Sequence, residues 1–159
     1  MNTETRANQF QIARHGIVVL LIGLLAGIGF SMAASSSSLT SQRYETWHFA
    51  HLEGLLNGVV VLALAASWGF IENGTAYVRW GRWLLLIGAY ANAIGPWITA
   101  VFIKHRVIHP HSALEDFVVY CFYIPGVLPL VSVGLFTWAI FAKRTVRFSN
   151  ATPQETIIQ

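Results

Sequence analysis

Four apolar runs, each long enough to cross a lipid bilayer, constrain the fold of this chain more than any other feature. In this sequence of 159 residues they cover about 16–34, 47–71, 83–103 and 117–141. About 20 apolar residues in a helix span a hydrocarbon core of roughly 30 Å. Only 11% of the residues are charged, against roughly 25% in soluble domains. The sequence therefore predicts an all-α integral membrane protein, with four transmembrane helices in an antiparallel bundle forming one domain over residues 1–159 and a polar tail at 143–159.

Basic residues flank these runs unevenly. The N-terminal segment, the second loop and the C-terminal tail hold Arg6, Arg14, Arg79, Arg82, Lys143, Arg144 and Arg147. The other two loops hold Arg43, Lys104 and Arg106. Because cytoplasmic loops carry an excess of Lys and Arg, both termini are expected in the cytoplasm. The small net charge of +3 lies at the ends of the runs, which indicates contact with lipid headgroups and not with nucleic acid.

Prolines interrupt the last two runs. Pro96 lies inside the third run, and Pro125 and Pro129 lie inside the fourth. A proline within a helix removes a backbone donor and kinks the helix. We therefore predict that the third and fourth helices are bent.

The stretch Trp47–Gly58, W-H-F-A-H-L-E-G-L-L-N-G, carries most of the polar groups expected inside the membrane. Such groups are costly at that depth and indicate a function. Gly54 and Gly58 follow His51 on the same helix face. An imidazole above bare backbone suits a flat ligand, so we predict that His51 ligates a haem iron, with His48, Gly54 and Gly58 completing the cofactor site.

Other interpretations of these residues stay open. The two histidines could be interfacial groups that bond to a neighbouring helix, and a zinc site would need a third ligand from His105, His109 or His111. Those three are more simply explained as ordinary loop histidines.

Asn57 lies about 9 Å deeper than His51 and roughly 120° round the helix, so it cannot easily reach the far face of a porphyrin held by His51. A second helix, such as one from a neighbouring protomer, would complete that face. Asn57 and Asn92 could instead only join helices, worth about 0.6 kcal/mol each. Glu53 could orient an imidazole or serve as a protonatable site in a carrier.

Three segments resemble the bacterial styrene oxide isomerases: H-G-I-V-V-L-L-I-G-L-L-A-G-I-G-F-S-M, A-H-L-E-G-L-L-N-G and Y-A-N, in that order in the first three runs. The resemblance implies a small four-helix enzyme that spans the bacterial inner membrane several times. It also implies a homotrimer with ferric haem b between subunits. His51 corresponds to the iron ligand of the family, and Asn57 to the asparagine that helps hold substrate.

Two places depart from the family pattern. The family has an aspartate just before its W-A-N segment and a pocket tyrosine just after it, where this chain has Gly88 and Pro96, and Tyr90 replaces the tryptophan. The aromatic donors that could replace the tyrosine are Tyr90, Trp97, Tyr120 and Tyr123. We predict Asn57, Tyr90 and Asn92 as the catalytic residues.

The resemblance implies an isomerase that converts a small hydrophobic aryl epoxide to an aldehyde by Lewis-acid chemistry at ferric iron. An apolar pocket would keep water from the cation that develops. Two other functions stay open: a b-type haem electron carrier, which needs a second axial ligand, and a small proton-coupled transporter that uses Glu53. An optical spectrum distinguishes the first, and a His51→Ala variant the second.

Overall fold

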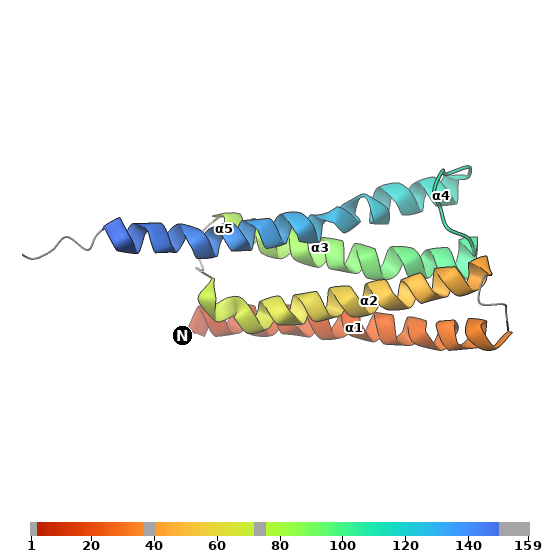
Figure 1. Ribbon diagram of the computed structural model, residues 1–159, viewed down its shortest axis with the longest axis horizontal. Helices are drawn as coiled ribbons and strands as arrows, with labels where there is room; N and C mark the ends of the chain where they lie inside the picture. Colours follow the sequence, from red (N-terminus) through yellow and green to blue (C-terminus); the bar gives the residue numbers. More distant parts are fainter. Residues whose placement is uncertain (1–2, 37–40, 72–75, 150–159) are drawn as a thin grey trace, which may run out of the picture.

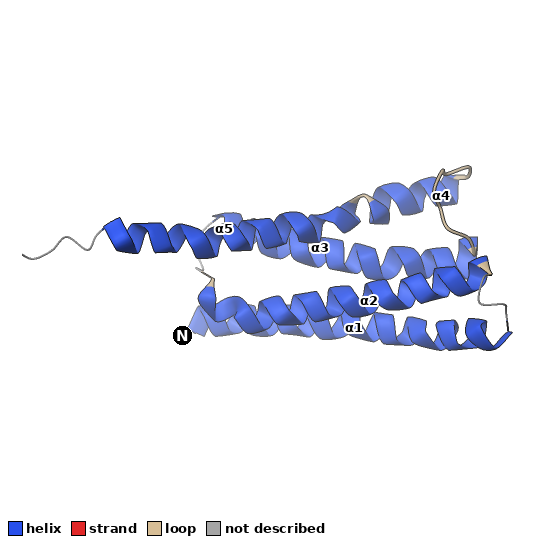
Figure 2. Cartoon of the chain, viewed as in Figure 1, coloured by secondary structure: helices blue, strands red, loops and turns tan. Residues whose placement is uncertain are grey.

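A computed structural model describes residues 3–36, 41–71 and 76–149 of the chain, and every element in these ranges is helical (Figure 2). The first three long helices are α1 (Thr3–Ser36), α2 (Gln42–Ala66) and α3 (Ala76–Ile98). Short turns extend two of them, η1 (Ser67–Phe70) and η2 (Thr99–Ile103). The last part of the chain is built from α4 (Ala113–Val118), η3 (Val119–Tyr123), η4 (Pro125–Val127) and α5 (Leu128–Ser149).

Four helical segments are long and apolar enough to cross a membrane, which confirms the predicted fold class. They are Thr5–Ser36, Gln42–Phe70, Ala76–Ile103 and Ala113–Phe141. The first helix begins well before the predicted start at residue 16, because the polar flank contains no glycine or proline that would end it. For the same reason α5 continues through Ser149 into the predicted tail, and residues 150–159 lie outside the described part.

The helices run back and forth along the long axis of the molecule (Figure 1). α1 packs along α2, α2 packs on α3, and α5 packs on the other side of α3. The N-terminus and the end of α5 lie at the same end of the bundle. An even number of crossings requires this, and the cytoplasmic location of that end stays a prediction.

Glycines allow α1 and α2 to touch backbone to backbone. A Cβ atom added at Gly23 would lie 2.5 Å from the carbonyl carbon of Gly54, and one added at Gly58 would lie 2.6 Å from the backbone nitrogen of Leu20. Membrane helices associate closely through such small residues. Gly54 and Gly58 therefore face α1. The surface that we predicted to lie beneath a flat ligand is covered, within this chain, by α1.

Regular α-helix gives way to other helical geometry close to the prolines of the third and fourth spans. Pro96 lies inside α3, and the wider turn of η2 follows it. Pro125 begins η4, which separates η3 from α5 (Figure 1). The hydroxyl of buried Ser132 on α5 donates to the carbonyl of Gly81 on α3 at 2.7 Å. This bond links the helix after the break to the centre of the bundle.

Candidate active site

α1 sets the orientation and the tautomer of the His51 ring. Nδ1 of His51 lies 2.8 Å from the carbonyl oxygen of Gly23. A carbonyl can only accept, so Nδ1 carries the proton, and Nε2 of the neutral ring is left with a free lone pair. A Cβ added at Gly27 would lie 2.9 Å from the ring, so this glycine makes the space that the imidazole fills. Metal-binding histidines commonly show this arrangement, in which the second nitrogen donates to a carbonyl.

Phe30 joins the two predicted histidines into one aromatic cluster. Its ring stacks on His51 at 5.9 Å between centroids and on His48 at 5.1 Å. His48 also stacks on Tyr44 at 5.8 Å, and its side chain is exposed. The structure therefore places His48 near His51 on the outer side of the α1–α2 pair.

The donor set at His51 fits a porphyrin better than a bare metal ion. Among the described residues, no three His, Cys, Asp or Glu side chains gather closely enough to hold a metal ion together. The zinc alternative, which needed His105, His109 or His111 as a third ligand, is therefore not supported. Haem iron needs only an axial ligand from the protein, and one imidazole with a free Nε2 provides it.

Asn57 and Asn92 belong to one hydrogen-bond network. The side-chain nitrogen of Asn57 donates to the backbone oxygen of Glu53 at 2.9 Å and to its Oε2 at 3.0 Å. The side-chain nitrogen of Asn92 donates to Oδ1 of Asn57 at 3.2 Å and to the carbonyl of Gly126 at 2.9 Å. The network joins α2, α3 and η4, and it uses both N–H groups of each amide.

His51 and Asn57 point to different sides of α2. The imidazole contacts α1, whereas the amide contacts Asn92 on α3. Six residues along a helix correspond to roughly 120° of separation, which accounts for this divergence. The two predicted site residues of one chain therefore do not share a pocket.

Tyr90, the third residue predicted as catalytic, lies apart from the two asparagines. Its hydroxyl lies 3.0 Å from Nδ1 of His15, in the groove between α1 and α3. Tyr90 and Asn92 are two residues apart, which turns their side chains about 160° away from one another on a helix. A helix can present only one of the two to the network around Asn57.

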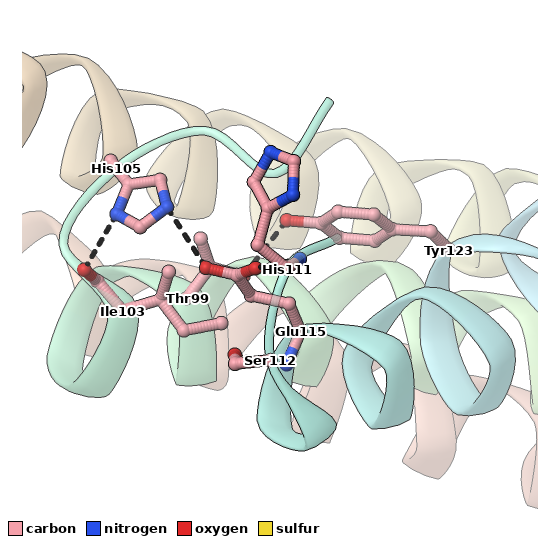
Figure 3. Close-up of polar contacts among 7 residues, drawn as sticks. All are labelled: Thr99, Ile103, His105, His111, Ser112, Glu115 and Tyr123. Carbon is pink, nitrogen blue, oxygen red and sulfur yellow. Dashed lines mark hydrogen bonds and ion pairs between the residues drawn. The ribbon is translucent and has the colours of Figure 1, made fainter. Parts of the chain in front are cut away.

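Tyr123 is one of the four aromatic donors that the sequence left open as replacements for the family tyrosine. The structure gives its hydroxyl a bonded position. Its oxygen lies 2.9 Å from Oγ1 of Thr99 (Figure 3). Thr99 gives its own proton to the carbonyl of Gly95 at 3.0 Å, so Tyr123 is the donor in the Tyr123–Thr99 bond. The two side chains line a cavity of about 220 Å³ together with Pro96 and Arg106.

Comparison with known proteins places this chain in a family. The family model for styrene oxide isomerase matches residues 8–141, which include the central part of every predicted span. The chain belongs to the styrene oxide isomerase family. It is also similar to two hydroxylaminobenzene mutases of Ectopseudomonas oleovorans. Styrene oxide isomerases and mutases are both isomerase-type enzymes. We therefore describe the chain as an isomerase-type membrane protein.

The similarity to the two mutases covers part of each protein. HabA is 26% identical over 63% of this chain and 68% of its own length. HabB is 32% identical over 58% of this chain and 54% of its own length. The chain thus spans about half the length of HabB.

The two departures from the styrene oxide isomerase pattern have structural explanations. A Cβ added at Gly88 would run into the ring of Pro129, so α5 fills the space that a side chain would need. At the other place, Pro96 lines the same cavity as Tyr123. The ring of Tyr123 comes within 3.4 Å of a Cβ built at Gly95. A hydroxyl from the fourth span therefore lies beside the position where the family pattern has tyrosine on the third.

His105 and the backbone of His111 help to hold the loop after α3. Glu115 accepts from the backbone nitrogen of His111 at 2.6 Å and pairs with Nε2 of His105 at 3.0 Å (Figure 3). Nδ1 of His105 lies 3.0 Å from the carbonyl of Ile103. Ser112 caps α4 by accepting from the backbone nitrogen of Glu115. These contacts tie the loop after α3 to the start of α4. The same loop borders the cavity that Tyr123 lines.

Proposed function

We propose that this protein is a haem b isomerase of the bacterial inner membrane that converts a small hydrophobic aryl epoxide to an aldehyde. The observation that carries the proposal is the His51 ring, which Gly23 holds through Nδ1 so that Nε2 is free to bind iron. Ferric haem, when bound, supplies a Lewis acid that polarises the C–O bond of an epoxide. No electron donor or second substrate is needed for that rearrangement.

The chain's own residues would then position the substrate and exclude water. We assign Tyr123 as the donor to the substrate oxygen, because its hydroxyl is free to exchange its bond to Thr99 for one to a ligand. Both amides of the asparagine network already use their N–H groups, so we assign Asn57 and Asn92 to holding α2, α3 and η4 together. The cavity of about 220 Å³ is of the right order for one aromatic ring with a short side chain, since a cavity of about 150 Å³ accepts benzene.

A homotrimer is part of the same proposal. His51 and Asn57 lie on different sides of α2, so a ligand on His51 cannot meet the asparagine of its own chain. A neighbouring copy would present to that ligand the side of its own bundle that carries Asn57 and Tyr123. The haem would then lie between subunits. Light scattering of the purified protein in detergent should then give the protein mass of three chains.

The test is a spectrum and an assay on the same preparation. We expect protein purified from iron-replete cells to show a haem Soret band, to bind an added ligand such as cyanide in the ferric state, and to form phenylacetaldehyde from styrene oxide without a co-substrate. A low-spin spectrum with two histidine ligands and no turnover would favour the electron carrier. Colourless, folded protein would reject the haem proposal, and pigmented protein inactive on every aryl epoxide would reject the reaction.

Hydroxylaminobenzene is a second candidate substrate, because two relatives are named for a mutase reaction on it. Hydroxylaminobenzene and styrene oxide both carry an oxygen-bearing group next to a benzene ring, and both conversions rearrange atoms within one molecule. We therefore expect competition between the two compounds for one site. Product analysis with each substrate, and inhibition of one reaction by the other compound, decides which is turned over.

Replacing Tyr123 with phenylalanine tests the assigned hydroxyl. Loss of one preorganised donor to a reacting oxygen costs about 100-fold in rate, so we expect kcat/KM to fall about that much while the pigment stays. Tyr120→Phe is the matched control, because Tyr120 is 66% exposed on the same part of the fourth span. Equal activity of the two variants would contradict the role of Tyr123.

A further inference from the structure

A second hollow of the molecule lies away from the proposed active site. It opens between α1 and α3 as a cavity of about 630 Å³, and its polar lining comes mainly from Arg14, His15, Arg82 and Tyr90. Arg14 and His15 lie in the first half of α1 and Arg82 in the first half of α3, so the hollow is nearer the end of the bundle at which these two helices begin. The active-site residues His51, Asn57 and Tyr123 do not line it.

An apolar groove continues from this cavity toward the middle of the bundle. A neighbouring cavity of about 340 Å³ shares His15 and Tyr90 with the first and extends along α3 as far as Phe122. Its lining is almost entirely apolar, with side chains such as Leu86 and Ile94. Arg82 and Tyr90 are eight residues apart, so their Cα atoms are separated by about 12 Å along the helix axis. The two adjoining cavities together therefore have a basic end and an apolar end.

The basic end holds cationic charge that the cavity lining does not balance. Arg82 donates from Nη1 to Oδ1 of Asn8 at 2.7 Å and lies over the ring of Trp83. These contacts hold the guanidinium in place and still leave most of its five N–H donors for a ligand. Among the described residues that line the two cavities there is no aspartate or glutamate. An anion next to an aliphatic chain complements this combination of charge and shape.

We propose that the groove binds one phospholipid, with its anionic headgroup at Arg14 and Arg82 and one acyl chain along α3 toward Phe122. The His15–Tyr90 pair stands where the two parts meet and offers polar atoms to the glycerol region. Anionic lipids concentrate in the cytoplasmic leaflet, and basic pockets between helices on that side bind their headgroups. The proposal does not depend on the isomerase reaction.

The experiment compares lipids on the full-length protein in nanodiscs and by native mass spectrometry. Wild-type protein is expected to retain phosphatidylglycerol in preference to phosphatidylcholine. The Arg14→Gln/Arg82→Gln double variant is expected to lose about 25-fold of that preference, at about fivefold per arginine. Arg79→Gln is the matched control, because Arg79 is exposed on α3 one turn away and does not line the groove. Arg14→Lys/Arg82→Lys keeps the charge and is expected to retain most of the preference, which separates charge from a folding defect.

Three results would overturn the proposal. An equal loss of preference in the Arg79 control would show a general attraction of the basic surface. Displacement of the lipid by millimolar inorganic phosphate or glycerophosphate would show a site for a free anion, without a role for the apolar groove. Wild-type protein that retains no phospholipid, because a second copy or the substrate fills the groove, would also reject it.

Discussion

Replacing His51 with alanine is expected to abolish the haem pigment and to lower isomerase activity at least about 100-fold. Changing only the partners that orient a metal ligand costs 10–100-fold in affinity or activity, so removal of the ligand should cost more. Nε2 of His51 is the nitrogen that the bond to Gly23 leaves free. The Soret absorbance per polypeptide and the rate of aldehyde formation measure both effects.

His48→Ala is the control for that experiment. The His48 ring is exposed and stacks on Phe30 and Tyr44, and the structure gives it no bond that would fix a free nitrogen. We expect this variant to keep its pigment and most of its activity. Pigment lost from His48→Ala but retained in His51→Ala would show that His48, and not His51, binds the iron. If both variants remained pigmented and active, the haem site would have to lie elsewhere.

Replacing Gly23 with alanine should destabilise the bundle by about 3 kcal/mol, near the upper end of overpacking effects. The added Cβ would lie 2.5 Å from the backbone of Gly54, and the three nearest atoms all belong to the backbone of α2. α1 and α2 must therefore separate. For a chain of this size such a loss lowers the melting temperature by about 10 °C. Thermal unfolding in detergent measures it.

The same substitution should also weaken cofactor binding, because the carbonyl of Gly23 is the group that holds His51. Gly134→Ala is the matched control: a Cβ at Gly134 meets nothing within 4 Å, and alanine favours helix by about 1 kcal/mol over glycine. It should be neutral or slightly stabilising. A Gly23→Ala variant as stable and as pigmented as wild type would show that the two backbones are not in contact.

The local pattern of the sequence was enough to predict the fold class. Inside a bilayer each backbone polar group must find its partner within its own segment, so an apolar run of sufficient length has to be a helix. The proline interruptions in the third and fourth spans follow from an equally local cause. α1 and α5 extend beyond the apolar runs because hydropathy marks where a helix meets lipid and gives no sign of where the helix itself stops.

The direction in which each polar side chain points was decided only by tertiary structure. Gly54 lies against the backbone of α1, and Tyr90 bonds to His15 whereas Asn92, two residues further on, bonds to Asn57. The bond between Asn57 and Asn92, and the meeting of Tyr123 with Thr99, join residues from different helices. In a span that is apolar on nearly all sides, hydrophobicity does not specify which face turns inward. The rotation of each helix is set instead by the close fit of small residues and by a few hydrogen bonds to its neighbours.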